Sequence, residues 1–183
     1  MLSGARIKHT SWNSEVYEPS DDSFLLVDAL LEHAPKWRLQ PPRCCVELGS
    51  GSGYVICSLA LMLQQLGIRC QLLAIDHSTA AAKATTQTLR NHEVSNVDVV
   101  TADMFTPAHR NLLGSVDVLV FNPPYVPTPD EELLLPGVAT AWAGGHMGRR
   151  VIDRLLGQLD ALLSPAGELF MVTVTENRPE GEE

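Results

Sequence analysis

A glycine-rich turn at residues 47–53 constrains the fold of this chain more than any other feature. Its sequence is Glu-Leu-Gly-Ser-Gly-Ser-Gly, and it overlaps the end of a short apolar run at residues 44–48. A nearly continuous apolar run of this length is typical of a strand that is buried on both faces of a parallel sheet. In open α/β sheets, ligands bind beyond the carboxyl ends of such strands. The turn therefore predicts a parallel sheet with a ligand site at its edge.

Apolar runs and helical patterns alternate along the rest of the chain. Ser20 can cap a helix, because Asp21 and Asp22 follow it and acidic residues suit the positive end of the helix dipole. The expected strands are residues 44–48, 70–76, 97–101, 116–121 and 168–175; the other expected helices are 53–66, 79–91 and 148–163, and the expected loops are 35–42 and 122–148. Strands that alternate with helices imply right-handed crossovers. The predicted fold class is therefore α/β, with a doubly wound, mostly parallel sheet.

The length of 183 residues predicts one domain. We expect a loose N-terminal arm at residues 1–15, the domain at 16–177 and a polar tail at 178–183. The longest apolar stretch, Val55 to Leu63, is much shorter than the roughly 20 residues that a membrane helix needs. Residues 1–10 contain no signal-peptide core. We therefore expect a cytoplasmic location, with the nucleus as an alternative.

Charge and cysteine spacing disfavour other kinds of partner. The chain has 13 Lys and Arg against 22 Asp and Glu, a formal charge of −9. Direct nucleic-acid binding is disfavoured, because that affinity comes chiefly from Lys and Arg that neutralise phosphates. None of the four cysteines has the spacing of a zinc site, and no histidine has a second ligand at a suitable distance in the sequence. We therefore expect buried thiols and no bound metal.

The glycine-rich turn favours a cofactor with a positive charge. A dinucleotide fingerprint would need its third glycine at position 54, where this chain has Tyr54. Glu47 would also repel a pyrophosphate. S-adenosylmethionine fits better, because it carries a sulfonium and an ammonium group and no phosphate. The alternative interpretation is that the glycines only make a tight turn against the next helix.

Two more acidic residues follow the next two strands. Asp76 is placed to accept hydrogen bonds from two ribose hydroxyls, although it could instead cap the helix that begins at Thr79. Asp103 could accept from the amino group of adenine while Met104 packs on the ring, or it could simply form a turn before Pro107. Acids at the ends of three successive strands lie on one edge of a parallel sheet. Together they favour the methyl-donor interpretation.

The segment Asn-Pro-Pro-Tyr at residues 122–125 predicts an acceptor site. Two successive prolines end the preceding strand, because proline lacks a backbone donor and restricts the residue before it. The carbonyl of Pro123 and the side-chain oxygen of Asn122 then offer two acceptors, which match the two N–H bonds of a planar NH2 group. Tyr125 supplies a flat face for stacking. Trp142 fits a packing corner and the lip of this site equally well.

These residues resemble class I S-adenosylmethionine-dependent methyltransferases that act on amino or amide nitrogen. Residues 16–24 and 141–145, with Gly148 and Asp153, narrow the resemblance to the HemK-like eukaryotic release-factor glutamine methyltransferases, over roughly residues 16–177. The resemblance implies that S-adenosylmethionine is held by Ser23, Glu47, Gly49, Gly51, Gly53, Asp76, Asp103, Met104 and Asn122. It implies that Asn122, Pro123 and Tyr125 act in catalysis, and that the substrate contacts are Asn122, Pro123, Pro124 and Tyr125.

The resemblance also implies a reaction and partners. In that family the reaction is N5-methylation of the glutamine in the Gly-Gly-Gln loop of the translation termination factor. Histone lysine and the N6 amine of adenine in DNA or RNA are alternative acceptors; the first is disfavoured because lysine nitrogen is not planar, the second because of the charge of −9. A small zinc-binding activator subunit is implied as a partner, and the edge strand at residues 97–101 is its expected binding place.

The end of the sequence departs from the resembled family. That family's fold continues past the last predicted strand into another helix and an antiparallel strand pair, whereas this sequence ends at Glu183. We therefore expect a class I fold that lacks this strand pair. An alternative of a different class follows from the same departure, namely a cofactor-binding interaction protein without catalytic activity.

Overall fold

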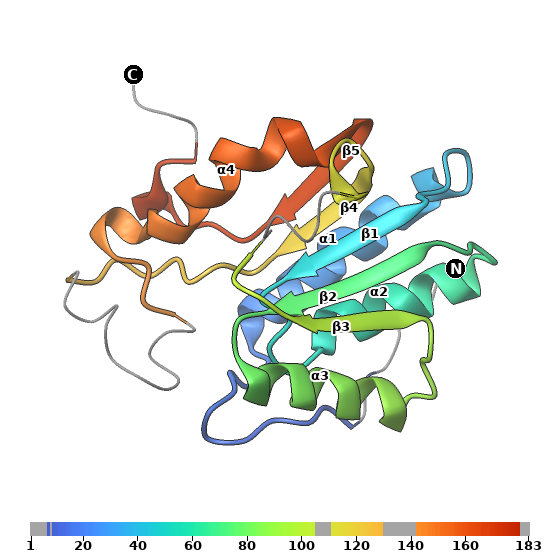
Figure 1. Cartoon of the computed structure of the whole chain (residues 1–183), viewed down its shortest axis with the longest axis horizontal. Coiled ribbons are helices and arrows are strands. Elements are labelled where there is room, and N and C mark those ends of the chain that lie inside the picture. Colours follow the sequence, from blue (N-terminus) through green and yellow to red (C-terminus); the bar gives the residue numbers. More distant parts are fainter. Residues whose placement is uncertain (1–6, 8, 105–110, 130–141, 180–183) are drawn as a thin grey trace.

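A five-stranded parallel sheet organises the described part of the chain, residues 7, 9–104, 111–129 and 142–179 of the computed structural model. The strands are β1 (Cys44–Leu48), β2 (Gln71–Asp76), β3 (Val97–Thr101), β4 (Val116–Phe121) and β5 (Leu163–Met171). They pair in the order β3-β2-β1-β4-β5, and every pair is parallel (Figure 1). This order confirms the predicted doubly wound α/β sheet. The described residues contain no antiparallel strand pair.

Helices cover both faces of this sheet (Figure 1). They are α1 (Asp21–Trp37), α2 (Tyr54–Gln65), α3 (Thr79–Asn91) and α4 (Arg150–Leu162). Leu30 of α1 and Ile56 of α2 are fully buried in one core, and Leu155 of α4 is fully buried in the other. Residues of β1 alternate between the two cores, with Cys45 in the first and Val46 in the second, as the two-residue period of a strand requires. All five residues of β1 are buried, which confirms the predicted strand buried on both faces.

The predicted loop at residues 35–42 is wrong at its beginning, because α1 continues through Pro35 to Trp37. Proline removes one hydrogen bond from a helix and crowds the preceding turn. Here it lies in the last turn, and the neighbouring Ala34 and Trp37 are 0% and 3% exposed. Burial of these two side chains offsets the lost bond.

The predicted bounds of the last strand are also wrong. β5 begins at Leu163, directly after α4, and ends at Met171 instead of Thr175. Its pairing with β4 starts at Leu163 opposite Val116 and resumes at Glu168 opposite Val118 after an irregularity. The intervening Pro165 and Gly167 give this stretch the composition of a loop, and the regular pairing with β4 is interrupted there.

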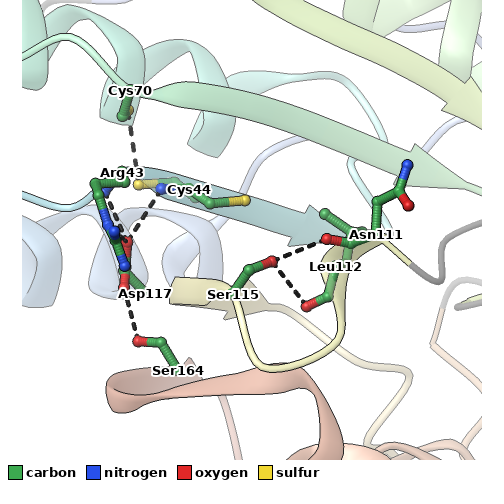
Figure 2. Close-up of polar contacts among 9 residues, drawn as sticks. Arg43, Cys44, Cys70, Asn111, Leu112, Ser115, Asp117 and Ser164 are labelled. Atoms are coloured by element: carbon green, nitrogen blue, oxygen red, sulfur yellow. Dashed lines mark hydrogen bonds and ion pairs between the residues drawn. The ribbon is translucent and has the colours of Figure 1, made fainter.

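A polar network fastens the amino ends of the strands (Figure 2). Asp117 Oδ2 accepts from the backbone N–H groups of Arg43 at 2.7 Å and Cys44 at 3.2 Å, and Oδ1 accepts from the Ser164 hydroxyl at 2.6 Å. Burial acts to raise the pKa of Asp117, but these hydrogen bonds outweigh it and hold that pKa below its usual range. One carboxylate thus connects the beginnings of β1, β4 and β5.

The four cysteines are free thiols. Cys44, Cys45 and Cys57 are buried as predicted, whereas Cys70 is only half-buried; its sulfur lies 3.9 Å from that of Cys45 near the Asp117 network (Figure 2). Within the described ranges, no group of three or more side chains is arranged to hold a metal ion. Nor does any described helix have the length and apolar character to cross a membrane.

Part of the predicted N-terminal arm docks on α3. The N–H of Ser11 donates to Thr88 Oγ1 at 2.8 Å, and Asn91 Nδ2 donates to the carbonyl of His9 at 3.1 Å. Residues 1–6 and 8 of the arm and 180–183 of the tail lie outside the described residues. The domain boundaries at residues 16 and 177 remain predictions.

Candidate active site

A cavity of about 860 Å³ opens at the carboxyl ends of the strands. This volume lies within the range of about 300–1,000 Å³ that is usual for small-molecule sites. The predicted site residues that line it are Ser23, Glu47, Gly49, Gly51, Asp76, Asp103, Met104, Asn122, Pro123, Pro124 and Tyr125. Trp142 also lines it and is 37% exposed, which places this side chain at the lip.

The glycine-rich turn forms part of the cavity wall with backbone that carries no side chain at Gly49 and Gly51. Gly49 and Gly51 have φ angles of +63° and +52°, a region that favours glycine. The N–H of Gly49 donates to the carbonyl of Ile75 at 2.7 Å, and the N–H of Gly51 donates to Asp76 Oδ2 at 2.9 Å. These bonds fix the turn after β1 to the end of β2.

Gly53 does not line the cavity. It caps the N-terminus of α2 with a φ of +78°, and a Cβ atom at this position would lie 2.7 Å from the Cα of Thr85. The close approach of the turn to α3 therefore requires glycine here. The structure gives Gly53 a packing role, and its predicted contact with the cofactor stays a prediction.

Glu47 is a buried acid in the cavity wall. Its side chain is carried on β1, the residue is 2% exposed, and Oε2 accepts from the N–H of Ile56 at 2.9 Å. Burial raises the pKa of Glu47 well above its usual range, and the negative charge of Asp76 raises it further. A cationic group in the cavity would reverse this shift, because an opposite charge favours the carboxylate. Glu47 therefore favours a cationic ligand over an anionic one.

Asp76 is held by the backbone on both of its oxygens. Oδ1 accepts from the N–H of Ser78 at 2.8 Å, and Oδ2 accepts from Gly51. The alternative role of Asp76 as a helix cap is wrong, because the cap of α3 is Ser78, whose hydroxyl accepts from the N–H of Ala81. Asp76 is 5% exposed and lines the cavity. Its position is thus fixed before any ligand binds.

Asp103 and Met104 differ in their surroundings. The side chain of Asp103 is 68% exposed, and its Oδ2 accepts from Arg154 Nη2 of α4 at 3.0 Å. An exposed ion pair of this kind contributes little to stability. Met104 is buried and has a φ of +52°. Arg154 also lines the cavity, and the sequence offered no signal for this residue beyond a charged helix face.

Asn122 lines the cavity, and its side-chain oxygen has no hydrogen-bond partner. Its Nδ2 donates to Asp22 Oδ2 at 3.1 Å, whereas its Oδ1 is buried without a hydrogen-bond partner. A buried polar atom left in this state costs about 1–3 kcal/mol. Because Asn122 lines the cavity, an N–H group of a bound ligand is the natural partner for this oxygen.

Tyr125 shares the same carboxylate. Its hydroxyl donates to Asp22 Oδ2 at 3.1 Å. Burial raises the pKa of Tyr125 to about 12, and the negative charge of Asp22 contributes to the shift. The phenol therefore stays protonated at neutral pH. The sequence assigned Asp22 only to the helix dipole, so its contacts with residues a hundred positions away were missed.

The side-chain amide of Asn177 connects two segments at the lip of the cavity. Its Nδ2 donates to the carbonyls of Tyr125 and Met147, both at 2.8 Å, and its Oδ1 accepts from the N–H of Val174 at 2.9 Å. A Cβ atom on Gly148 would lie 1.9 Å from the carbonyl oxygen of Tyr125. The segment that follows β5 and the end of the long loop thus meet at the acceptor motif.

The structure describes both ends of the predicted long loop, residues 122–129 and 142–148. Val126 forms a parallel bridge with Ala143 beside the acceptor motif. The segment 130–141, including Ala141 of the predicted motif, lies outside the described residues, as does the predicted turn at Pro107. Asp153 of that motif accepts from Arg149 at 3.0 Å on the exposed face of α4.

The donor set fits a sulfonium cofactor. Glu47, Asp76 and Asp103 are the acids that line the cavity at the ends of β1, β2 and β3, and Glu47 is buried. A phosphate would face these like charges, whereas an ammonium or sulfonium group would be attracted to them. A doubly wound parallel sheet with such a site defines a class I, Rossmann-like methyltransferase.

Comparison with known proteins gives the family. The methyltransferase small domain family matches residues 22–135. Methyltransferase HEMK2 of Mus musculus is 45% identical over 166 residues, which cover 91% of this chain and 75% of that protein. The eRF1 methyltransferase catalytic subunit mtq2 of Schizosaccharomyces pombe is 37% identical over 174 residues, with 90% and 74% covered. The chain belongs to the methyltransferase small domain family, together with the HEMK2 and mtq2 methyltransferases.

Solved structures support the fold. The ribosomal protein L11 methylase of Lactobacillus delbrueckii subsp. bulgaricus gives a TM-score of 0.51 at 17% identity, over 90% of this chain and 67% of that one. A Plasmodium falciparum protein-L-isoaspartate O-methyltransferase in complex with S-adenosyl-L-homocysteine gives 0.51 at 13% identity, over 89% and 67%. The family resemblance and the class I fold predicted from the sequence are thus confirmed.

Proposed function

We propose that this chain transfers a methyl group from S-adenosylmethionine to the side-chain nitrogen of the glutamine in the Gly-Gly-Gln loop of a translation release factor. The S. pombe relative is named for eRF1, and a Mycobacterium tuberculosis relative, 34% identical over 151 residues, is a release factor glutamine methyltransferase. The observation that carries the proposal is the unpartnered Oδ1 of Asn122 in the cavity wall. We place the reaction in the cytoplasm, where release factors act.

The cofactor supplies an electrophilic methyl group when it is bound. Glu47 and Asp76 would hold its charged and hydroxyl groups, with Ser23, Gly49, Gly51, Asp103 and Met104 as further contacts. These acids lie at the ends of β1, β2 and β3, on the same side of the sheet as the acceptor motif. The cofactor assignment therefore rests on one continuous cavity wall.

The acceptor motif orients the nucleophile. A glutamine NH2 is planar and has two N–H bonds, which Asn122 Oδ1 and the carbonyl of Pro123 can each accept. Accepting both bonds fixes the plane of the amide and aims its nitrogen into the cavity. Positioning of this kind can account for a large part of a rate enhancement. Pro124 and Tyr125 line the same wall and supply the contact surface for the glutamine side chain.

No general base is required of this chain. Tyr125 has a pKa of about 12 and stays protonated. An amide nitrogen that gains a methyl group becomes strongly acidic, so it loses its proton to water. The chain's contribution is therefore the orientation of the acceptor amide.

The test of this function is methylation of defined acceptors with isotope-labelled S-adenosylmethionine, read by mass spectrometry. We expect label on the loop glutamine of intact release factor and none when that glutamine is replaced by alanine. The Asn122→Ala enzyme is the matched control; we expect its turnover to fall by about 100-fold or more. The proposal would be contradicted if histone lysine or adenine became labelled and the release factor did not.

The edge strand β3 is the proposed binding place of a small zinc-binding activator subunit. β3 is the first strand in the sheet order, so one side of its backbone is unpaired within the described sheet. The S. pombe relative is named a catalytic subunit. Such an edge is a template for strand addition by another chain.

A proline tests this edge without disturbing the sheet. The N–H of Ala102 donates inward to the carbonyl of Asp76, and backbone groups alternate in direction along a strand, so the N–H of Thr101 points outward. Thr101→Pro removes that outward donor, which an edge strand tolerates. We expect loss of co-purification with the activator and an unchanged circular dichroism spectrum. Undiminished co-purification would place the activator elsewhere.

A further inference from the structure

The carboxylate of Asp22 accepts hydrogen bonds from two separate segments of the chain, residues 17–23 and 122–125. Its Oδ2 accepts from Asn122 Nδ2 at 3.1 Å, from the Tyr125 hydroxyl at 3.1 Å and from the Tyr17 hydroxyl at 3.2 Å. Its Oδ1 accepts from Ser20 and from Ser23. The first turn of α1 is thereby connected to the acceptor motif, although Asp22 and Asn122 are 100 positions apart in the sequence.

The chemistry of this contact fixes which way the Asn122 amide faces. An ionised carboxylate only accepts hydrogen bonds, so the NH2 side of Asn122 must face Asp22. The oxygen side must then face away from Asp22, and this is the atom that is buried without a partner. With the opposite orientation, Asn122 would present an NH2 group to the NH2 group of the substrate, and the two donors could not pair.

Asp22 is not available as a proton acceptor. Hydrogen bonds from Ser20, Ser23, Asn122 and Tyr125 already fill the roughly four acceptor positions of a carboxylate. Burial acts to raise its pKa, but the hydrogen bonds, with that from Asn122 the largest, outweigh burial and lower the pKa below its usual range. The group therefore stays ionised, and it acts through the residues that it holds.

We propose that Asp22 is a positioning residue that sets the orientation of the Asn122 amide, so that Oδ1 receives the NH2 group of the acceptor. This inference rests on the proposed function, because it assigns the orientation to glutamine binding. It adds a residue of α1 to the acceptor site.

The substitution Asp22→Asn tests the role of Oδ2, because it replaces one of the two carboxylate oxygens with an NH2 group. The remaining oxygen can still accept from Ser20 and Ser23, whereas the new NH2 group cannot accept from Asn122 or Tyr125. The NH2 group also donates, which favours the opposite orientation of the Asn122 amide. Asp21→Asn is the matched control, because Asp21 is the exposed neighbour in the same helical turn and its replacement removes the same charge.

The first readout is steady-state kinetics on release factor. We expect Asp22→Asn to lower kcat by roughly 10- to 100-fold, with the affinity for S-adenosylhomocysteine changed by less than about threefold. In the Asn122→Ala background the same substitution should change kcat by less than about twofold, because its effect passes through Asn122. A purely structural role would lower the rate again in that background and would overturn the inference, as would a wild-type kcat for Asp22→Asn.

The second readout does not depend on activity. The side-chain amide resonances of Asn122, assigned by their loss in Asn122→Ala, should shift in Asp22→Asn and not in Asp21→Asn. Unmoved resonances would overturn the orientation claim even if the enzyme methylates glutamine. Shifted resonances in an enzyme that fails to methylate the release factor would instead contradict the proposed function. If Asp22→Asn does not fold, Asp22→Glu tests the same geometry, because it keeps the charge and displaces the oxygens; we expect lowered kcat there too.

Discussion

Replacement of Asn177 should loosen the lip of the active site. Asn177 is 3% exposed and makes three hydrogen bonds, to the carbonyls of Tyr125 and Met147 and from the N–H of Val174. Each such bond contributes about 0.5–1.5 kcal/mol net, so Asn177→Ala should lower the free energy of unfolding by about 2–4 kcal/mol. For a chain of this length, 1 kcal/mol corresponds to roughly 2–4 °C in Tm. We therefore expect Tm to fall by about 4–16 °C.

The same substitution should affect the acceptor more than the donor. The carbonyl of Tyr125 belongs to the acceptor motif, whereas the donor residues Glu47 and Asp76 are held by other contacts. We expect KM for release factor to rise about tenfold and the affinity for S-adenosylhomocysteine to change little. Glu176→Ala, an exposed neighbour, is the control for Tm and KM. If Asn177→Ala matches that control in both quantities, the reasoning about this amide is refuted.

Three other predictions concern single positions. Glu47→Gln should weaken S-adenosylmethionine binding by roughly 10- to 100-fold in calorimetry, because it removes the buried negative charge. Since the folded pKa of Glu47 is raised, the free energy of unfolding of the wild type should also fall as pH rises above about 4.5. This decrease should be absent in the variant. Gly53→Ala should destabilise the chain by more than about 1 kcal/mol in urea unfolding, because its Cβ would lie 2.7 Å from the Cα of Thr85; equal stability would refute the packing role. Asp117 has a lowered folded pKa, so its contribution is complete above about pH 4 and is lost as pH falls below that value; the Tm difference between wild type and Asp117→Asn should therefore shrink in acid, and a constant difference would contradict the assignment.

The sequence predicted the first four strands well and the last strand poorly. Strands such as Val97–Thr101 and Val116–Phe121 are apolar runs with clear ends, and the structure has the same bounds. β5 contains Pro165 and Gly167, which locally resemble a loop, and only its pairing with β4 shows that the strand begins at Leu163. Similarly, the core around Trp37 carries α1 past a proline. Local composition could not reveal either effect of tertiary packing.

The site could be predicted where a residue acts at the end of its own strand. Glu47, Asp76 and Asn122 stand at such ends, and all of them line the cavity. Asp22 and Asn177 reach the acceptor motif from distant segments, through side-chain contacts that no local pattern records. Locally, Asp22 is explained as a residue at the start of a helix, and Asn177 as a polar residue near the C-terminus. Their roles became visible only from the hydrogen bonds that they make.

The Asp117 network has a consequence for how this fold can change. It sits at the amino ends of the strands, whereas Glu47 lies near the carboxyl end of β1, so roughly 10 Å of strand separates Cys44 from Glu47. Effects of substitutions at such distances usually add within about 0.3–0.5 kcal/mol. Substitutions around Ser164 and Arg43 should therefore change the stability of the fold without changing the choice of acceptor. Stability can thus change at the amino ends of the strands while the reaction at their carboxyl ends stays the same.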